Sequence, residues 1–180
     1  NDWESNTDVL DERLDETITI LQIERALKGA FPHSYRDDSS FGRFVYFQGD
    51  DDTLSWVSTV SPQRAGGLTA WQLESRSGEG VFLKLVPALS DNPEQRFDDV
   101  EATPLLPNYE AEFSYLYEEL DFSKEWRDEW LGEEQNALPL AVHILLTPIQ
   151  AEDTRSINIV ANIAANTHRD IRPTTSGASG

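Results

Sequence analysis

The N-terminal segment of the chain, residues 7–31, most constrains the fold, because its helical pattern is followed only by strand-like patterns. Residues recur at intervals of three and four, as on one face of a helix: Leu10, Leu14, Thr17 and Leu21. Further apolar residues are expected to widen this face in the second half: Ile20, Ile23, Leu27, Ala30 and Phe31. Pro32 predicts the end of the helix, since a proline disfavours helical geometry in the preceding residue.

The two halves of this segment differ in their surroundings. Up to Glu16 a narrow leucine stripe lies among acidic residues, whereas beyond Glu16 the apolar face is broad. A broad face must pack on a sheet, and a narrow stripe can stand clear of the domain and touch one partner. An ordinary amphipathic helix with a solvated acidic back explains the same pattern, so both interpretations stay open.

Beyond the helix, the pattern predicts strands. Segments 43–48 and 53–60 flank GDDD and predict a hairpin, and segments 68–75 and 80–89 flank RSGE and predict a second one. Residues 90–108 contain Pro93, Pro104 and Pro107 and are expected to form a surface loop. Alternating apolar residues predict later strands at 110–119 and 155–166, and the longer apolar run at 138–149 predicts a strand that is buried on both faces.

One helix followed by antiparallel strands predicts an α+β domain. We expect an N-terminal helix over residues 1–31, a globular β head over residues 32–166 and a flexible tail over residues 167–180.

Acidic residues dominate the composition, with 33 Asp and Glu against 14 Lys and Arg and a formal net charge of −19. Such a field repels nucleic acids and anionic membranes, and it attracts cations or basic partner surfaces. Solubility alone also explains an acidic surface. The chain has no cysteine, which excludes disulfides and thiol chemistry.

Acidic side chains are better metal candidates than the histidines. His33, His143 and His168 lie on separate segments and lack the short spacing of a zinc site. Calcium takes about six to eight oxygen ligands, often from one loop. The loop of residues 91–101 is favoured over Asp50–Asp52, and its candidate ligands are Asp91, Asp98, Asp99 and Glu101. The alternative is a set of charged turns that keep strand edges soluble, and we expect no cofactor.

Trp126 and Trp130 are the candidates for a carbohydrate site, because aromatic rings stack on sugars and carboxylates across a cleft cleave glycosides. The acids beside them are Glu125, Asp128, Glu129 and Glu133. Tryptophans four apart lie on one side of a helical turn, and we favour an inward-packed pair that closes a loop over the sheet. The sequence lacks the G-x-S-x-G, P-loop and G-x-G-x-x-G motifs, so catalysis is poorly supported.

Four segments carry a family resemblance: ERALKGAFP with YRD, FQGDDDTLSWVSTVSPQRAGGL, LLPNYEAEFSYLYEE, and WRDEWLGEEQNALPLAVHILL. In order and spacing, over residues 20–146, they resemble the J-type minor pseudopilins of bacterial type II secretion systems. The chain departs from that family at Asn108-Tyr109, where a glycine and a β-branched residue are usual, and at His143, where a basic residue is common. Residues 150–180 have no counterpart in the resemblance.

The resemblance implies a pseudopilin fold, with a long N-terminal helix packed on antiparallel sheets, and a structural protein that is not an enzyme. It implies a leader peptidase that cuts and methylates the precursor, a membrane helix upstream of Asn1, and a periplasmic domain held at a bacterial inner membrane. The implied partners are the I-type and K-type minor pseudopilins, with the H-type and the major pseudopilin as further ones. Together they form a tip complex that initiates the pseudopilus and supports protein export.

With these partners, the leucine stripe predicts a partner interface formed by Leu10, Leu14, Ile18 and Leu21. Two alternatives stay open: a minor type IV pilin, which shares the fold and differs in partners, and a secreted carbohydrate-binding or glycoside-cleaving domain. A retained apolar helix upstream would favour either pilin-like protein, and a cleavable signal peptide would favour the secreted domain.

Overall fold

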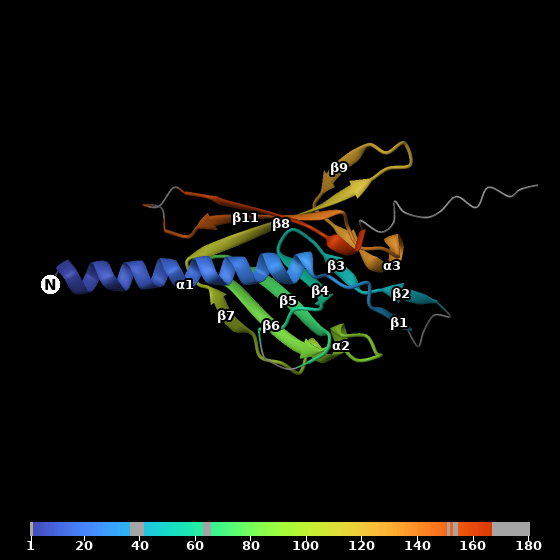
Figure 1. The fold of residues 1–180 in the computed structure, drawn as a ribbon, viewed down its shortest axis with the longest axis horizontal. Coiled ribbons are helices and arrows are strands. Elements are labelled where there is room, and N and C mark those ends of the chain that lie inside the picture. Colours follow the sequence, from blue (N-terminus) through green and yellow to red (C-terminus); the bar gives the residue numbers. More distant parts are fainter. Residues whose placement is uncertain (1, 37–41, 63–65, 151, 153–154, 167–180) are drawn as a thin grey trace, which may run out of the picture.

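A computed structural model describes residues 2–36, 42–62, 66–150, 152 and 155–166, and within these ranges it describes side chains from residue 11 to residue 165. Its helix α1 runs along two antiparallel sheets, so the described chain is an α+β protein (Figure 1). In this part of the chain, no helix combines the length and the apolarity needed to cross a membrane. The tail predicted for residues 167–180 lies outside the described residues.

The main elements, in chain order, are α1 (Asp2–Lys28), β1 (Ser34–Arg36), β2 (Arg43–Val45), β3 (Phe47–Gly49), β4 (Thr53–Ser58), β5 (Thr69–Arg76), β6 (Gly80–Pro87), α2 (Glu94–Phe97), β7 (Thr103–Leu106), β8 (Tyr109–Glu118), β9 (Lys124–Arg127), β10 (Trp130–Leu131), α3 (Gly132–Gln135), β11 (Ala141–Pro148) and β12 (Ile157–Asn162). A short 3-10 turn, Ala164–Asn166, follows β12.

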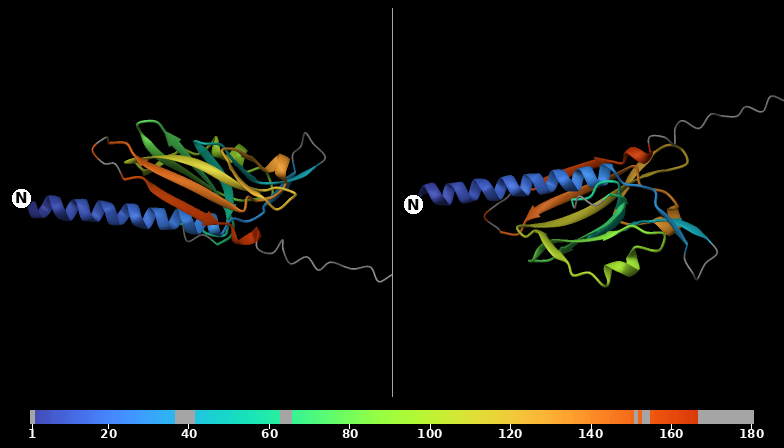
Figure 2. Two further views of the ribbon diagram at one scale, coloured as in Figure 1. Left: turned by 90° about the horizontal axis from the view of Figure 1, so that it is seen from above. Right: turned by 60° about the horizontal axis from the view of Figure 1, so that its bottom comes forward.

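The larger of the two main sheets has the strand order β10-β3-β4-β5-β6-β7, and the smaller has the order β12-β11-β8-β9. A separate two-stranded sheet pairs β1 with β2. Both predicted hairpins are confirmed, as β3 pairs with β4 across GDDD and β5 pairs with β6 across RSGE. Figure 2 shows that α1 lies along the sheets at its C-terminal end and extends beyond them at its N-terminal end. The predicted alternation of β8 is also confirmed, since Phe113 and Tyr115 are both buried.

The principal core lies between the two sheets and the C-terminal half of α1. Trp56 of β4 and Trp71 of β5 stack there, with ring centroids 5.5 Å apart. Tyr115 of β8 reaches across to the larger sheet, where its hydroxyl donates a hydrogen bond to the Asp50 carbonyl at 2.8 Å. A smaller cluster covers the other face of the larger sheet; its buried members are Tyr35, Tyr46, Val57, Ala70, Val86 and Phe97.

The helix begins and ends earlier than the predicted range of 7–31. The prediction that Pro32 marks its end is wrong, because the helix ends at Lys28 and the Ala30 N–H donates to the Leu27 carbonyl at 3.1 Å, three residues back instead of four. Ala30 then pairs with Ser58 in an isolated bridge, and Phe31 lies outside the helix and is exposed.

Four other segments differ from prediction. Residues 90–108 contain α2 and β7. Because β7 is an edge strand, it is a place in the sheet where a proline such as Pro104 is tolerated. The strand predicted over 43–48 is divided at Tyr46 into β2 and β3, which pair with different partners. The strand predicted over 138–149 begins only at Ala141, and the segment around the tryptophans holds β9, β10 and α3.

Candidate functional site

The helix α1 carries an exposed apolar stripe, formed by Leu14, Ile18 and Leu21. These side chains are 59%, 47% and 48% exposed, respectively. Leu10 lies in α1 at the position that continues the stripe toward the N-terminus, but its side chain is outside the described part of the chain. The structure therefore brings three of the four predicted interface side chains together on the surface.

A separate buried face of α1, formed by Ile23, Ala26 and Leu27, packs into the principal core. At about 100° per residue, the nine positions from Leu14 to Ile23 amount to about 900°, or two and a half turns, so the two side chains leave the helix on opposite sides. The prediction of a single apolar face that widens is wrong in this respect. The helix has two apolar faces, one for the head and one that points away from it.

Hydrogen bonds fix the buried face against the larger sheet. The Ala26 carbonyl accepts a hydrogen bond from Trp56 Nε1 at 2.9 Å and a second from Ser58 Oγ at 2.7 Å. The Gly29 carbonyl accepts from the Thr59 N–H at 3.0 Å, which anchors the chain just after the helix. Because both Ala26 and Trp56 are buried, this anchor sets the direction in which the exposed stripe points.

Asn108, in the turn between β7 and β8, holds α1 at the edge of the head. Its side-chain amide donates to Glu12 Oε1 and to Glu16 Oε1, both at 2.8 Å. These carboxylates are one helical turn apart and repel each other, so a shared donor between them stabilises the helix. N-terminal to this clamp, α1 extends past the sheets (Figures 1 and 2).

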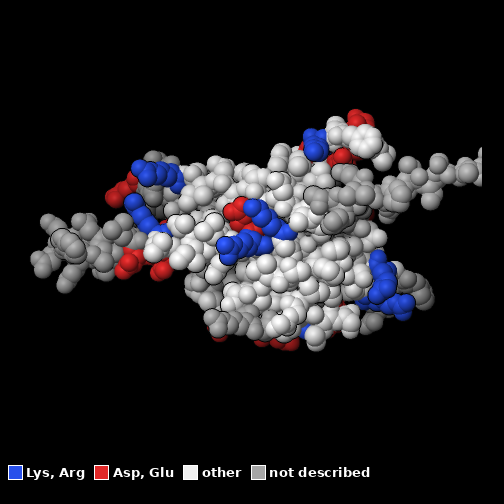
Figure 3. Space-filling view, in the orientation of Figure 1, with Lys and Arg blue, Asp and Glu red and all other residues white. Residues whose placement is uncertain are grey.

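The charges beside the stripe are mixed. Figure 3 shows the side of the molecule that carries α1, where charged side chains gather near the projecting end and again further along the helix, with uncharged surface between them. Glu24 and Lys28 form an ion pair at 3.0 Å at the C-terminal end. The charged side chains therefore do not cover the exposed side of α1 completely.

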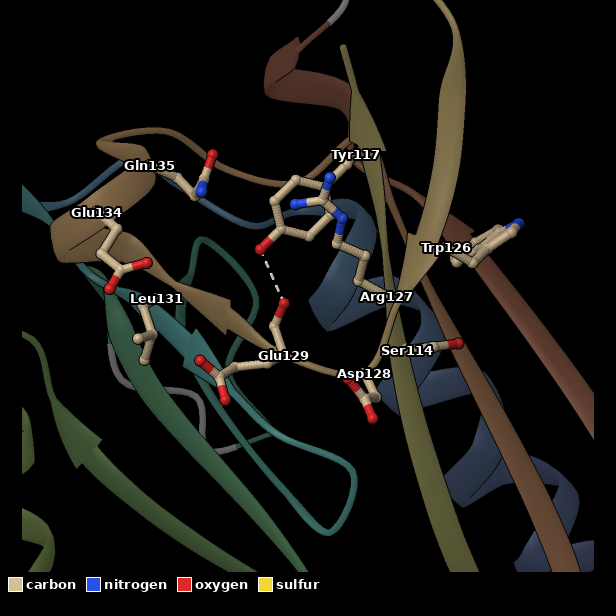
Figure 4. Close-up of a pocket in the computed structure, with 9 residues that line it drawn as sticks. All are labelled: Ser114, Tyr117, Trp126, Arg127, Asp128, Glu129, Leu131, Glu134 and Gln135. Carbon is tan, nitrogen blue, oxygen red and sulfur yellow. Dashed lines mark hydrogen bonds between the residues drawn. The ribbon is translucent and has the colours of Figure 1, made fainter.

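A second feature is an open hollow of about 620 Å³ between the smaller sheet and α3, lined in part by Tyr117, Arg127, Glu129 and Glu134 (Figure 4). The Tyr117 hydroxyl donates to the Glu129 carbonyl at 2.8 Å, and the Arg127 guanidinium carbon lies 4.3 Å from the Tyr117 ring centroid. Burial raises the pKa of Tyr117, and the positive charge of Arg127 partly offsets this. The arrangement keeps the tyrosine protonated, and Arg127 is already paired with Glu119 and Glu125.

The two tryptophans lie on strands rather than on a helical turn, and they have different surroundings. Trp130 is 5% exposed, donates to the Ala137 carbonyl at 3.1 Å and packs against Tyr117, with ring centroids 4.4 Å apart. Trp126 is 45% exposed and meets the His143 ring edge-on at 5.9 Å. The inward-packed interpretation is therefore confirmed for Trp130 and wrong for Trp126.

The tryptophans also fail to form a shared platform for a sugar. Trp126 contributes to the lining of the hollow, but its ring points away from Tyr117 and Arg127 (Figure 4). This follows from the strand, because neighbouring residues such as Trp126 and Arg127 point to opposite faces of a sheet. Trp130 is buried beneath the hollow and presents no open ring face.

The histidines remain apart. His143 is half-buried on β11, a central strand, with Nε2 2.9 Å from Asn158 Oδ1. His33 is buried, and within the described residues its Nε2 has no hydrogen-bond partner. His168 lies outside the described residues. Neither described histidine joins a cluster of metal-ligating side chains in this part of the chain.

The favoured calcium candidates are not brought together. Within the described residues, the one group of three or more acidic or histidine side chains at ligand spacing is Asp50, Asp51 and Asp52, not the set from residues 91–101. Asp91 instead pairs with Arg96 at 2.9 Å, which neutralises its charge. Asp50 Oδ1 caps its own turn by accepting from the Asp52 and Thr53 N–H groups at 3.0 and 2.7 Å.

Sequence reasoning missed the clamp at Asn108 and the hairpin formed by β8 and β9. The signal for the hairpin was present, because the alternation of residues 110–119 is followed by Asp121 and Ser123, which favour turns, and then by a second short polar strand. Comparisons of the chain with protein-family models, with curated proteins and with solved structures found no match.

Proposed function

We propose that this chain is the periplasmic part of a J-type minor pseudopilin, a non-enzymatic subunit of the tip of a type II secretion pseudopilus. The observation that carries the proposal is the exposed stripe of Leu14, Ile18 and Leu21 on a helix whose opposite face is anchored in the core. Burying a leucine or isoleucine side chain is worth about 1.5–3 kcal/mol. A partner helix that covers the stripe would recover that free energy.

The spacing of the stripe favours a helix as the partner. Leu14 and Leu21 are one heptad apart, and Leu10 with Thr17 completes the alternation of four and three residues that is typical of a two-helix seam. The extension of α1 past the sheets leaves room for a second helix alongside it (Figure 2). The α+β architecture, with one helix before the antiparallel strands, and the order of the four sequence segments support the same proposal.

In this proposal, an upstream apolar helix anchors the protein in the inner membrane, after a leader peptidase has cut and methylated the precursor. The I-type and K-type minor pseudopilins are its partners, with the H-type and the major pseudopilin joining the same tip. The subunit acts by fixing the relative positions of its neighbours when the pseudopilus is initiated, and needs no bound cofactor to do so.

A minor type IV pilin would use the same helix with other partners, and only the partners distinguish it. The carbohydrate-binding alternative has weaker support, because Trp130 is buried and Trp126 turns its ring away from Arg127. A panel of soluble oligosaccharides tests that alternative directly, by titration of the wild-type chain and of Trp126→Ala.

The test of the proposal is binding to the purified periplasmic domain of the I-type subunit. Leu14→Glu combined with Leu21→Glu should abolish binding and leave the melting temperature within a few degrees, because both side chains are exposed. Leu89→Glu is the matched control, since Leu89 is 55% exposed and lies before α2, outside the stripe. Unchanged binding by the double variant would refute the proposal.

A further inference from the structure

The tip of the β8–β9 hairpin presents two apolar side chains to solvent. Leu120 is 102% exposed and Phe122 is 81% exposed, more than any other large apolar side chain that the structure describes. The hairpin projects from the head, and among the described elements none shelters its tip (Figure 1). Single exposed apolar residues are common on protein surfaces, but a pair at a projecting tip is typical of an interaction site.

Phe122 is held in an unfavourable backbone conformation. Its φ is +66°, in the left-handed region, which is an outlier for a bulky residue. Glycine or asparagine would adopt this conformation at lower cost, as Asn136 does at the end of α3. The turn thus keeps an exposed aromatic residue where folding alone would favour a small or polar one.

The turn is well ordered by its own hydrogen bonds. Glu119 N–H donates to the Ser123 carbonyl at 2.8 Å, and Phe122 N–H donates to the Glu119 carbonyl at 3.0 Å. Asp121 Oδ1 accepts from Ser123 N–H at 3.0 Å, and Arg127 of β9 pairs with Glu119 across the stem. A tip ordered in this way loses little conformational entropy when it binds.

The charges around the tip limit what it can bind. The segment from residue 118 to residue 127 carries Glu118, Glu119, Asp121 and Glu125 against Lys124 and Arg127. Arg127 pairs with Glu119 and Glu125, which leaves a net charge of −2 on the hairpin end. Such a rim, on a chain of net charge −19, repels an anionic membrane surface and a second copy of the chain. It complements an apolar pocket that is bordered by lysine and arginine side chains.

We propose that the tip of the β8–β9 hairpin is a second docking site, which inserts Leu120 and Phe122 into an apolar, basic-rimmed pocket on another subunit of the same tip complex. This inference rests on the proposed function. The exposed stripe of α1 binds one neighbour through a helix, and the hairpin tip binds a different neighbour. The chain then links two subunits that need not touch each other.

The experiment uses the chain of residues 1–180 and the purified periplasmic domains of the I-, K- and H-type subunits, titrated separately. The tip variant combines Leu120→Ser with Phe122→Ser. The stripe variant combines Leu14→Glu with Leu21→Glu. The control combines Leu89→Ser with Val160→Ser, which lie at two other exposed positions. The tip variant should weaken binding of one subunit by about 30-fold or more, as loss of a hot spot does. It should leave the stripe-dependent subunit bound, and Glu118→Lys should weaken the same tip contact.

The outcomes separate the two claims. If the tip variant binds every subunit as the wild type does while the stripe variant loses one, the inference is wrong and the proposed function stands. If the stripe variant loses nothing, the proposed function is wrong. Two further measurements compare the tip variant with the wild type: self-association by light scattering and co-sedimentation with phosphatidylcholine vesicles. If the tip variant loses one of these properties and still binds every subunit, the inference is wrong.

Discussion

The two apolar faces of α1 contain the same kinds of side chain and have opposite environments. The buried face, with Ile23, Ala26 and Leu27, is 2% exposed or less, whereas Leu14, on the exposed stripe, is 59% exposed. Hydrophobicity alone therefore does not explain the helix, since the head has room for one face only. The contrast teaches that the exposed stripe contributes little to the fold, which leaves it free for the binding role proposed above.

The largest expected change in stability comes from the two tryptophans, of which one is buried and the other is half exposed. Trp130→Ala should lower the free energy of unfolding by about 3–5 kcal/mol, because it removes a buried ring from between Tyr117 and Phe47. Trp126→Ala should cost less than about 1 kcal/mol, because its ring is half exposed. Urea unfolding measures the free energy of unfolding of both variants. Equal losses of free energy would show that the burial of a side chain in this structure does not predict its contribution to stability.

The two faces of α1 can be compared directly with two leucines. Leu27→Ala should lower the free energy of unfolding by about 2–5 kcal/mol, because the cavity it leaves lies in the principal core. Leu14→Ala should change it by less than about 0.5 kcal/mol. A stability loss at Leu14 as large as that at Leu27 would contradict the division of the helix into two faces.

A smaller effect is expected at the anchor of the buried face. Trp56→Phe removes the N–H that donates to the Ala26 carbonyl, and Ser58→Ala removes the second donor. Each should cost about 1–2 kcal/mol, and the double variant should cost more than their sum, because the buried carbonyl then has neither donor. Thermal unfolding of the four proteins in the cycle provides the measurement, and strict additivity would argue against a shared acceptor.

The smallest effect is expected at the Asn108 clamp. Asn108→Ala removes the donor shared by Glu12 and Glu16 and should cost about 1 kcal/mol or less, since the site is partly exposed. The change should be local: amide hydrogen exchange should accelerate in α1 around Glu12 and Glu16 and stay unchanged around Leu27. Uniform acceleration along the helix would show that the two faces are not independently held.

The sequence predicted the order of elements well where local signals were strong. Alternating residues with polar turns located both hairpins of the larger sheet, and helical spacing located α1. Helical spacing alone places Leu14 and Ile23 on opposite sides of α1, so two faces were predictable. The sequence could not predict which face is buried, because that depends on the position of the sheets. The same limit explains why the prediction for Trp126 and Trp130 was partly wrong. Their spacing was compatible with a helical turn, whereas the strands that hold them form only by pairing with distant residues.

The candidate site was predictable in part. The spacing of Leu14, Ile18 and Leu21 identified residues that prove to be exposed, whereas the acids of the 91–101 loop looked like a cluster only along the chain. Asp91 turns to Arg96 instead, a contact that depends on how the loop folds around α2. Phe122 gave no sequence signal, because its left-handed backbone depends on the geometry of the turn.

The most direct test of the central claim exploits the absence of cysteine in this chain. A nitroxide label on Leu14→Cys would report the exposed stripe, and the same label on Leu89→Cys would serve as a control outside it. On addition of the I-type subunit's periplasmic domain, the label at position 14 should become strongly immobilised, while the label at position 89 keeps its mobility. Unchanged mobility at position 14, with the I-type domain shown to be bound, would contradict the account.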